Sequence, residues 1–341
     1  MQLTERQRLM DILEGRTVDR PAVICPGGMM SAATIEVLQS FVHGSHTDPF
    51  VMADTAVEIR KSTGFENFGV PFCMTVEAEP LGSIVDLGNS SVEPRVVAYA
   101  GSTLAELKFS SAPDPASDGR LPVVLEAISI LARLAGPTPV IGNLTGPVSL
   151  ASSVLDPMQF FRLMGRDPGG VHVLLDFLTD YLAAFARAQV RAGADVVCIA
   201  DPTASGEIIG ADFFREFAAP CLTRLIDEVR ANGAGAILHI CGDTSILMDE
   251  MSKLRGAALS FDSVVNMKKA KEKITSSPLM GNISTQLLDQ GTPEKVRNAA
   301  MRALQNGVDI VSPACGLSLA TPLENLKALT DTVKNAGSKP R

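Results

Sequence analysis

The sequence predicts a (β/α)₈ barrel, in which eight parallel strands form a closed sheet and a helix follows each strand. Short apolar runs alternate with longer helical stretches along most of the chain, which is the pattern of parallel βα units. We count eight such runs, which favours a closed barrel over an open sheet. The length of 341 residues also suits a single barrel. We therefore expect one domain over residues 1–341.

The individual elements follow from local signals. Thr4 and Gln7 form a capping-box pattern, so a helix is expected from there to about Gly15. The predicted strands are 21–25, about 70–76, 139–146, 194–201, 236–243, 258–262, 278–284 and 308–315. Helices are predicted at 31–66 with a break near 43–49, and at 122–135, 171–192, 211–231, 245–254, 266–274, 293–306 and 322–335. A stretch at about 70–120 is expected to be an insertion with hairpins and a loop.

Composition excludes several classes of function. Lys and Arg total 30 against 38 for Asp and Glu, giving a net charge of −8, which argues against nucleic-acid binding. The apolar stretches are short and interrupted, and the N-terminus shows no secretory signal, so no membrane span or export is predicted. Six cysteines are too few for a disulfide scaffold of this length. We expect a cytoplasmic protein with reduced cysteines.

A metal site is predicted from three residues at the ends of two strands. His239 and Cys241 are two apart on a strand, so both side chains point to the same face. Cys315 ends the last strand, and the carboxyl ends of all barrel strands converge at one face. One imidazole and two thiolates suit Zn²⁺ and leave a fourth position open, as in catalytic zinc sites.

Two acidic residues and two amides complete the candidate site. Asp201 closes a strand and Glu207 follows in the next loop. Either could hold the imidazole of His239 or take a proton from an incoming substrate. The alternative is that Asp201 orders its own turn and Glu207 is a solvated loop residue. Asn143 and Asn282 also lie at strand ends and are candidate substrate-binding residues.

The other cysteines and histidines have simpler interpretations. A cysteine on a strand is usually a small core side chain. We expect that role for Cys73, Cys198 and Cys221, and leave Cys25 open because a Gly-rich loop follows it. The remaining histidines are expected to be solvated or structural, with two in a surface loop and one at a helix start: His43, His46 and His172. No nucleotide-binding or nucleophile-elbow motif is present.

Taken together, these settings resemble a known family. The stretches 200–210, 238–243, 280–284, 312–317 and 321–328 are similar to those of methylcobamide:coenzyme M methyltransferases of the uroporphyrinogen decarboxylase superfamily. The likeness covers nearly the whole chain and implies a barrel of the uroporphyrinogen decarboxylase type. The decarboxylase branch has an Arg-bearing N-terminal motif, whereas residues 24–30 here read Ile-Cys-Pro-Gly-Gly-Met-Met.

The resemblance implies a mechanism. It implies that His239, Cys241 and Cys315 bind Zn²⁺, that a small thiol takes the open position, and that methylcobamide donates the methyl group. A corrinoid carrier's D-x-H-x-x-G motif is absent, because residue 237 is Ile, so we expect a separate methylated corrinoid protein as partner. The Gly-rich stretch 26–30 is a hypothetical contact for it.

Some alternatives stay open. Residues 261–266 depart from the family's usual run, so the acceptor could be coenzyme M, another thiol or tetrahydrofolate. A second hypothesis is a tetrapyrrole decarboxylase that uses Asp201 to bind pyrrole N–H groups. A third is a non-enzymatic partner of a corrinoid protein or of a metal.

Overall fold

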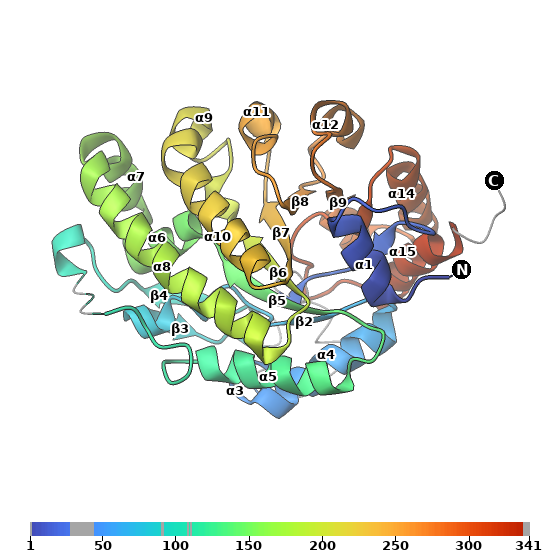
Figure 1. The fold of residues 1–341 in the computed structure, drawn as a ribbon, viewed down its shortest axis with the longest axis horizontal. Helices are drawn as coiled ribbons and strands as arrows, with labels where there is room; N and C mark the ends of the chain where they lie inside the picture. Colours follow the sequence, from blue (N-terminus) through green and yellow to red (C-terminus); the bar gives the residue numbers. More distant parts are fainter. Residues whose placement is uncertain (1, 28–43, 90–91, 108, 110, 337–341) are drawn as a thin grey trace.

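The computed structural model describes residues 2–27, 44–89, 92–107, 109 and 111–336. Eight parallel strands form one curved sheet in the order β1-β10-β9-β8-β7-β6-β5-β2. Their bounds are Ala22–Val23 (β1), Phe68–Val70 (β2), Val140–Thr145 (β5), Val196–Ala200 (β6), Gly235–Ile240 (β7), Ala257–Phe261 (β8), Leu279–Ile283 (β9) and Ile310–Pro313 (β10). The strands lie at the centre of the molecule with helices around them (Figure 1). This confirms the predicted barrel.

The helices follow the strands as expected. The α-helices are Glu5–Leu13 (α1), Gly44–Thr47 (α3), Pro49–Thr63 (α4), Leu121–Leu134 (α5), Pro147–Val154 (α6), Pro157–Arg166 (α7), Pro168–Ala192 (α8), Gly210–Phe213 (α9), Ala219–Ala231 (α10), Met248–Met251 (α11), Met267–Lys273 (α12), Thr285–Gln290 (α13), Pro293–Gln305 (α14) and Leu323–Ala336 (α15). The predicted capping box at Thr4 and Gln7 starts α1. The helix predicted from residue 31 lies partly outside the described residues, as do residues 28–30 of the Gly-rich stretch.

The two strands at the ends of the sheet order, β1 and β2, are joined by hydrogen bonds between the residues next to them. Asn67, just before β2, accepts a hydrogen bond from Cys25 N and donates one to Cys25 O, each at 2.9 Å. The backbone N–H of Glu66 donates to Val23 O at 2.9 Å. These bonds satisfy buried backbone groups at the end of β1, in place of a full strand ladder, and so close the barrel.

Prolines account for most differences from the predicted elements. The second strand ends at Val70 rather than continuing to about 76, because Pro71 has no N–H to donate to a ladder. Helices α6 and α7 were not predicted, because Pro147 and Pro157 resemble helix breakers but occupy the first helical position, where no N–H partner is needed. A single-turn π-helix, Phe214–Ala218, separates α9 from α10 within the helix predicted at 211–231.

Between β2 and α5 the chain forms a hairpin. Strands β3 (Ile84–Asp86) and β4 (Arg95–Ala98) pair antiparallel outside the barrel sheet. Among the helices that the structure describes, one, α8, is long and apolar enough to cross a membrane on length and composition alone, yet half of its apolar window is buried in the protein. It packs against α5, α6 and α10, which is the environment of a core helix.

Candidate metal centre

Three predicted ligands come together at the carboxyl end of the barrel. His239 is the second-last residue of β7, Cys241 follows that strand, and Cys315 follows β10. The imidazole nitrogen and the two sulfur atoms all lie within 4.8 Å of one another. Residues 74 positions apart in the sequence therefore share one small volume, because parallel strands end at the same face.

The two sulfurs are bonded to each other in this structure. Cys241 and Cys315 form a disulfide, whereas Cys25, Cys73, Cys198 and Cys221 are free. The prediction that all six cysteines are reduced is therefore wrong for this pair. A metal ion requires deprotonated thiolates, so the pair can serve as metal ligands only after reduction.

His239 is oriented for metal binding. Its Nδ1 lies 3.0 Å from the hydroxyl of Ser260, its neighbour in the ladder between β7 and β8. Its Nε2 is buried and has no hydrogen-bond partner among the described residues. Burial lowers the pKa of His239 to about 4, against the opposing effect of the Asp262 carboxylate. The imidazole is therefore neutral at physiological pH, and its free nitrogen can bind a metal.

The donor set fits zinc. An imidazole with an unpartnered buried nitrogen and two adjacent sulfurs is the combination of soft and borderline ligands that Zn²⁺ prefers. Three protein ligands leave room for one exchangeable ligand in a tetrahedral site. Asp262 lies beside this set, 3.4 Å from the Cys241 sulfur, and accepts a hydrogen bond from Gly242 N at 3.2 Å.

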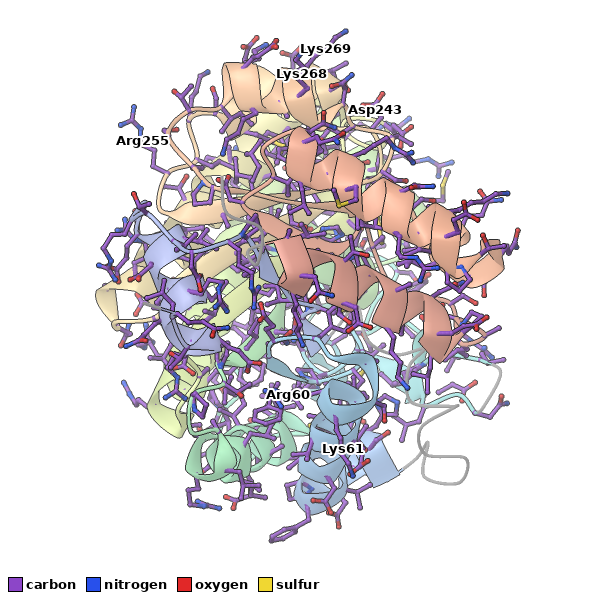
Figure 2. All side chains as sticks on the ribbon, turned by 90° about the vertical axis from the view of Figure 1, so that its right-hand side faces the viewer. Arg60, Lys61, Asp243, Arg255, Lys268 and Lys269 are labelled. Atoms are coloured by element: carbon purple, nitrogen blue, oxygen red, sulfur yellow. A yellow bond between two sulfur atoms is a disulfide. The ribbon has the colours of Figure 1, made fainter. Side chains whose placement is uncertain are left out.

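The loop that carries Cys241 lies at the surface of the molecule. Asp243, two residues after Cys241, is half-buried, and Ser245 is exposed. Figure 2 shows Asp243 on the same side as Lys268 and Lys269 of α12, while Arg60 and Lys61 of α4 lie on the opposite side. The metal centre thus opens near the face formed by the loops after β7 and β8.

Asp201 is used inside the protein. It is fully buried, and its Oδ1 accepts hydrogen bonds from Ser149 N (2.7 Å) and Ser149 Oγ (2.6 Å). Its Oδ2 accepts one from Val148 N at 3.2 Å. Burial raises the pKa of Asp201 to about 6, although these hydrogen bonds oppose the rise. The carboxyl group thus fixes the first turn of α6 to the end of β6, and its predicted catalytic role stays a prediction.

Glu207 is exposed, and its carboxylate accepts a hydrogen bond from Asp243 N at 3.1 Å. It therefore connects the loop after β6 to the loop that carries Cys241. The idea that Asp201 or Glu207 holds the imidazole of His239 is wrong, because Ser260 does so. Ser260 was missed because its role depends on strand register, which the sequence alone does not give.

The two predicted substrate-binding amides occupy different places. Asn143, on β5, donates to Val70 O at 3.1 Å and lines a cavity beside the metal ligands. Asn282, on β9, donates to Asp262 O and Val265 O at 2.9 and 2.8 Å. Asn282 therefore stabilises the loop after β8, and the substrate-binding role of both residues stays a prediction.

A cavity of about 230 Å³ adjoins the metal centre. Its walls come from the segment after β2, the loop before β4 and the ends of strands β5, β6 and β7. They are Phe72, Cys73, Met74, Glu93, Pro94, Asn143, Cys198, Ala200, Pro202, His239, Cys315 and Gly316. Because two of the predicted metal ligands line it, a small molecule in this cavity would lie next to a bound metal ion.

The fold and this site define a class of protein. The chain matches the uroporphyrinogen decarboxylase (URO-D) family over residues 4–336 and belongs to that family. A curated relative from Methanosarcina acetivorans, the methylcobamide:CoM methyltransferase MtbA, is 33% identical over 334 residues, which cover 97% of this chain and 98% of that protein.

Two further comparisons separate the branches of the family. A solved methyltransferase from Methanosarcina mazei superimposes with a TM-score of 0.92 at 32% identity, covering 98% of this chain and 99% of the other. A uroporphyrinogen decarboxylase from Anaeromyxobacter dehalogenans is 30% identical over 248 residues, or 70% of each chain. The methyltransferase likeness thus extends over more of the chain than the decarboxylase likeness does.

Proposed function

We propose that this protein is a zinc-dependent methyltransferase that moves a methyl group from a methylated corrinoid to a small thiol such as coenzyme M. The observation that carries the proposal is the convergence of His239, Cys241 and Cys315 within 4.8 Å at the carboxyl end of a barrel of this family. The names of the full-length relatives support the same reaction.

In this proposal each residue has a defined task. His239, Cys241 and Cys315 would hold the zinc ion, and a zinc ion bound there would lower the pKa of a coordinated thiol so that it ionises near neutral pH. Ser260 keeps the Nε2 of His239 directed away from the β8 side. The adjoining cavity would enclose the rest of the thiol.

The methyl donor comes from outside this chain. We propose that a separate corrinoid protein presents the methylated corrinoid to the face of the barrel that bears the metal centre. The proposed cellular location is the cytoplasm, where reducing conditions keep Cys241 and Cys315 available as thiolates.

The alternative within the family is decarboxylation of a tetrapyrrole. It is supported by the decarboxylase relative, which covers less of the chain. That reaction would need Asp201 to face its substrate, whereas both Asp201 oxygens accept hydrogen bonds from the start of α6. The methyltransferase proposal uses the unpartnered Nε2 of His239 and, once their disulfide is reduced, the sulfurs of Cys241 and Cys315.

Zinc content and methyl transfer together test the proposal. Reduced protein is expected to bind about one zinc ion per chain, to lose it in Cys241→Ala and Cys315→Ala, and to keep it in Cys221→Ala, a buried control on α10. Zinc-loaded protein is then mixed with methylcobalamin and a panel of thiols and tetrahydrofolate, and demethylation is followed by absorbance. Zinc-loaded protein that transfers methyl to no acceptor, or zinc-free protein that decarboxylates uroporphyrinogen, would defeat the proposal.

A further inference from the structure

The side chain of Asn143 lies on the wall of the cavity beside the metal centre. It is only 6% exposed, and its Nδ2 donates a hydrogen bond to Val70 O at 3.1 Å. A backbone carbonyl can only accept, so this bond fixes which end of the amide is the nitrogen. The Oδ1 atom is at the other end, and it has no hydrogen-bond partner among the residues that the structure describes.

Asn143 is held firmly in this position. Gln189 Nε2 donates a hydrogen bond to the backbone oxygen of Asn143 at 2.9 Å, and the residue lies within the ladder between β5 and β6. Buried polar atoms are almost always hydrogen-bonded, to the protein, to water or to a ligand. An unpartnered carbonyl oxygen on a cavity wall therefore indicates a place where a bound molecule donates a hydrogen bond.

Strand register places Asn143 deeper in the barrel than the metal ligands. Asn143 on β5 is in register with Cys198 on β6. His239 on β7 is in register with Ala200, two residues further along β6. Two residues correspond to about 6–7 Å along a strand. A small molecule held at the metal centre by its sulfur would point its tail toward Asn143, and a tail of two carbons followed by a hydrogen bond of about 2.8 Å covers about this distance.

The cavity is small, and no lysine or arginine is among the described residues that line it. Its volume of about 230 Å³ is below the roughly 300–1,000 Å³ that is typical of sites for drug-sized ligands. Arg120 contacts the sulfur of Cys73 at 3.5 Å, but its Nε is ion-paired with Glu79 at 2.7 Å. Burying an anion without a partner is costly. The cavity therefore fits a short, uncharged tail better than an anionic one.

We propose that Asn143 determines the class of thiol that this protein methylates, because its Oδ1 accepts a hydrogen bond from a donor group on the tail of the acceptor. The ligand class is a short thiol that carries a hydroxyl or another uncharged donor about two carbons from its sulfur. In the reaction the thiol loses its proton and its sulfur forms the new S–CH₃ bond. The Co–C bond of the corrinoid breaks, and its electron pair stays on cobalt.

The proposal rests on the proposed methyltransferase function and narrows its acceptor from small thiols in general to this class. Coenzyme M is the acceptor in the names of several relatives. Its sulfonate can only accept hydrogen bonds, so it would face Oδ1 of Asn143 without forming one. This chain is therefore expected to bind a hydroxyl-bearing thiol of the same length more tightly than coenzyme M.

Three thiols that share the same two-carbon unit test the proposal. β-Mercaptoethanol ends in a hydroxyl, n-propanethiol in a methyl group of similar size, and coenzyme M in a sulfonate. Isothermal titration calorimetry measures the binding of each thiol to reduced, zinc-loaded protein and needs no methyl donor. β-Mercaptoethanol is expected to bind at least about fivefold more tightly than n-propanethiol, which leaves Oδ1 of Asn143 unsatisfied. It is expected to bind at least about tenfold more tightly than coenzyme M, whose charge would be buried without a partner.

Asn143→Leu separates this contact from intrinsic differences between the thiols. Leucine is similar in size and has no acceptor atom, so the preference for β-mercaptoethanol over n-propanethiol is expected to disappear. Asn306→Leu is the control, because Asn306 is exposed at the end of α14, and it should keep the wild-type preference. In methyl-transfer assays with methylcobalamin, the preference should appear in KM rather than in kcat.

The outcomes distinguish this proposal from the function on which it rests. If wild-type protein binds n-propanethiol or coenzyme M as tightly as β-mercaptoethanol, the proposal is overturned, and methyl transfer to those thiols would leave the methyltransferase function standing. An unchanged preference in folded Asn143→Leu protein would also overturn it. If zinc-loaded protein neither binds nor methylates any of the three thiols, the proposed function fails as well. The wild-type comparison decides the question even if Asn143→Leu does not fold.

Discussion

The hydroxyl of Ser260 provides a direct test of the metal centre. Ser260→Ala removes the group 3.0 Å from Nδ1 of His239 and leaves that nitrogen without a partner in a fully buried position. The fold of β8 should tolerate the change, because alanine fits a buried strand position and the lost group is one oxygen. The expected effect is on the orientation and tautomer of the imidazole.

The magnitude follows from the single hydrogen bond that is lost. An unsatisfied buried polar group costs about 1–3 kcal/mol, which corresponds to about a 5- to 150-fold change in an equilibrium constant. Loss of the partner of a metal-binding histidine typically weakens metal binding by about 10- to 100-fold. We therefore expect the zinc dissociation constant of the reduced Ser260→Ala variant to rise by about 10- to 100-fold.

Competition with a chromogenic chelator measures this constant. Ser277→Ala is the matched control, because Ser277 is also buried and also donates one hydrogen bond, to Leu254 O, but lies before β9 at the other end of the barrel. Its zinc affinity should equal that of the wild type. A folded Ser260→Ala protein with unchanged zinc affinity would refute the assignment of His239 as a ligand oriented by Ser260.

Three further predictions follow from the same contacts. With the Cys241–Cys315 disulfide intact the protein should bind no zinc, and reduction with dithiothreitol should raise binding to about one zinc ion per chain. If the oxidised and the reduced protein bind the same amount of zinc, the proposed set of ligands is contradicted. Because burial raises the folded-state pKa of Asp201 to about 6, the contribution of this group to stability is complete below about pH 3.9 and is lost as the pH rises through 6. In urea denaturation the wild type, relative to Asp201→Asn, should lose on the order of 3 kcal/mol of unfolding free energy between about pH 4 and about pH 7. A stability difference between the two proteins that does not depend on pH would exclude this. Asn67→Ala removes both hydrogen bonds to Cys25 and should lower the free energy of unfolding by about 2–4 kcal/mol. The control Asn306→Ala, at the end of α14, should change this free energy by less than about 1 kcal/mol. Equal effects of the two substitutions would show that Asn67 does not close the barrel.

The sequence predicted the parts of the fold that depend on local pattern. The parallel strands from residue 139 onward lie close to their expected positions, because each is an apolar run between clear helix and turn signals. Four glycines at helix ends before strands, Gly64, Gly193, Gly233 and Gly307, have positive φ angles of 81°, 112°, 87° and 76°. Pro147 and Pro157 misled the prediction, because proline gives the same sequence signal when it breaks a helix and when it begins one.

The convergence of the three candidate metal ligands was predictable for a geometric reason. Strand alternation relates His239 to Cys241, and the common face of a parallel barrel relates both to Cys315, so no detailed coordinates were needed. Residues that contact those ligands were less predictable. Ser260 meets His239 through strand register, and Arg120 at the start of α5 meets Cys73, which is 47 residues away in the sequence. Such contacts depend on tertiary packing, and no local pattern marks them.

The choice of serine beside His239 has an electrostatic consequence for the proposed reaction. Two thiolates and a neutral imidazole would balance the charge of a bound Zn²⁺, so the Asp262 carboxylate beside Cys241 and a thiolate substrate would each add one negative charge to the site. A carboxylate hydrogen-bonded to the histidine would add a further negative charge in a buried position. Burying this charge would be costly because the protein interior has a low dielectric constant, and the charge would oppose the ionisation of the substrate thiol. A neutral hydroxyl fixes the imidazole without that cost. With Ser260 as the partner of His239, Asp262 is not joined by a second carboxylate at the imidazole, which limits the negative charge that an activated thiol acceptor would meet.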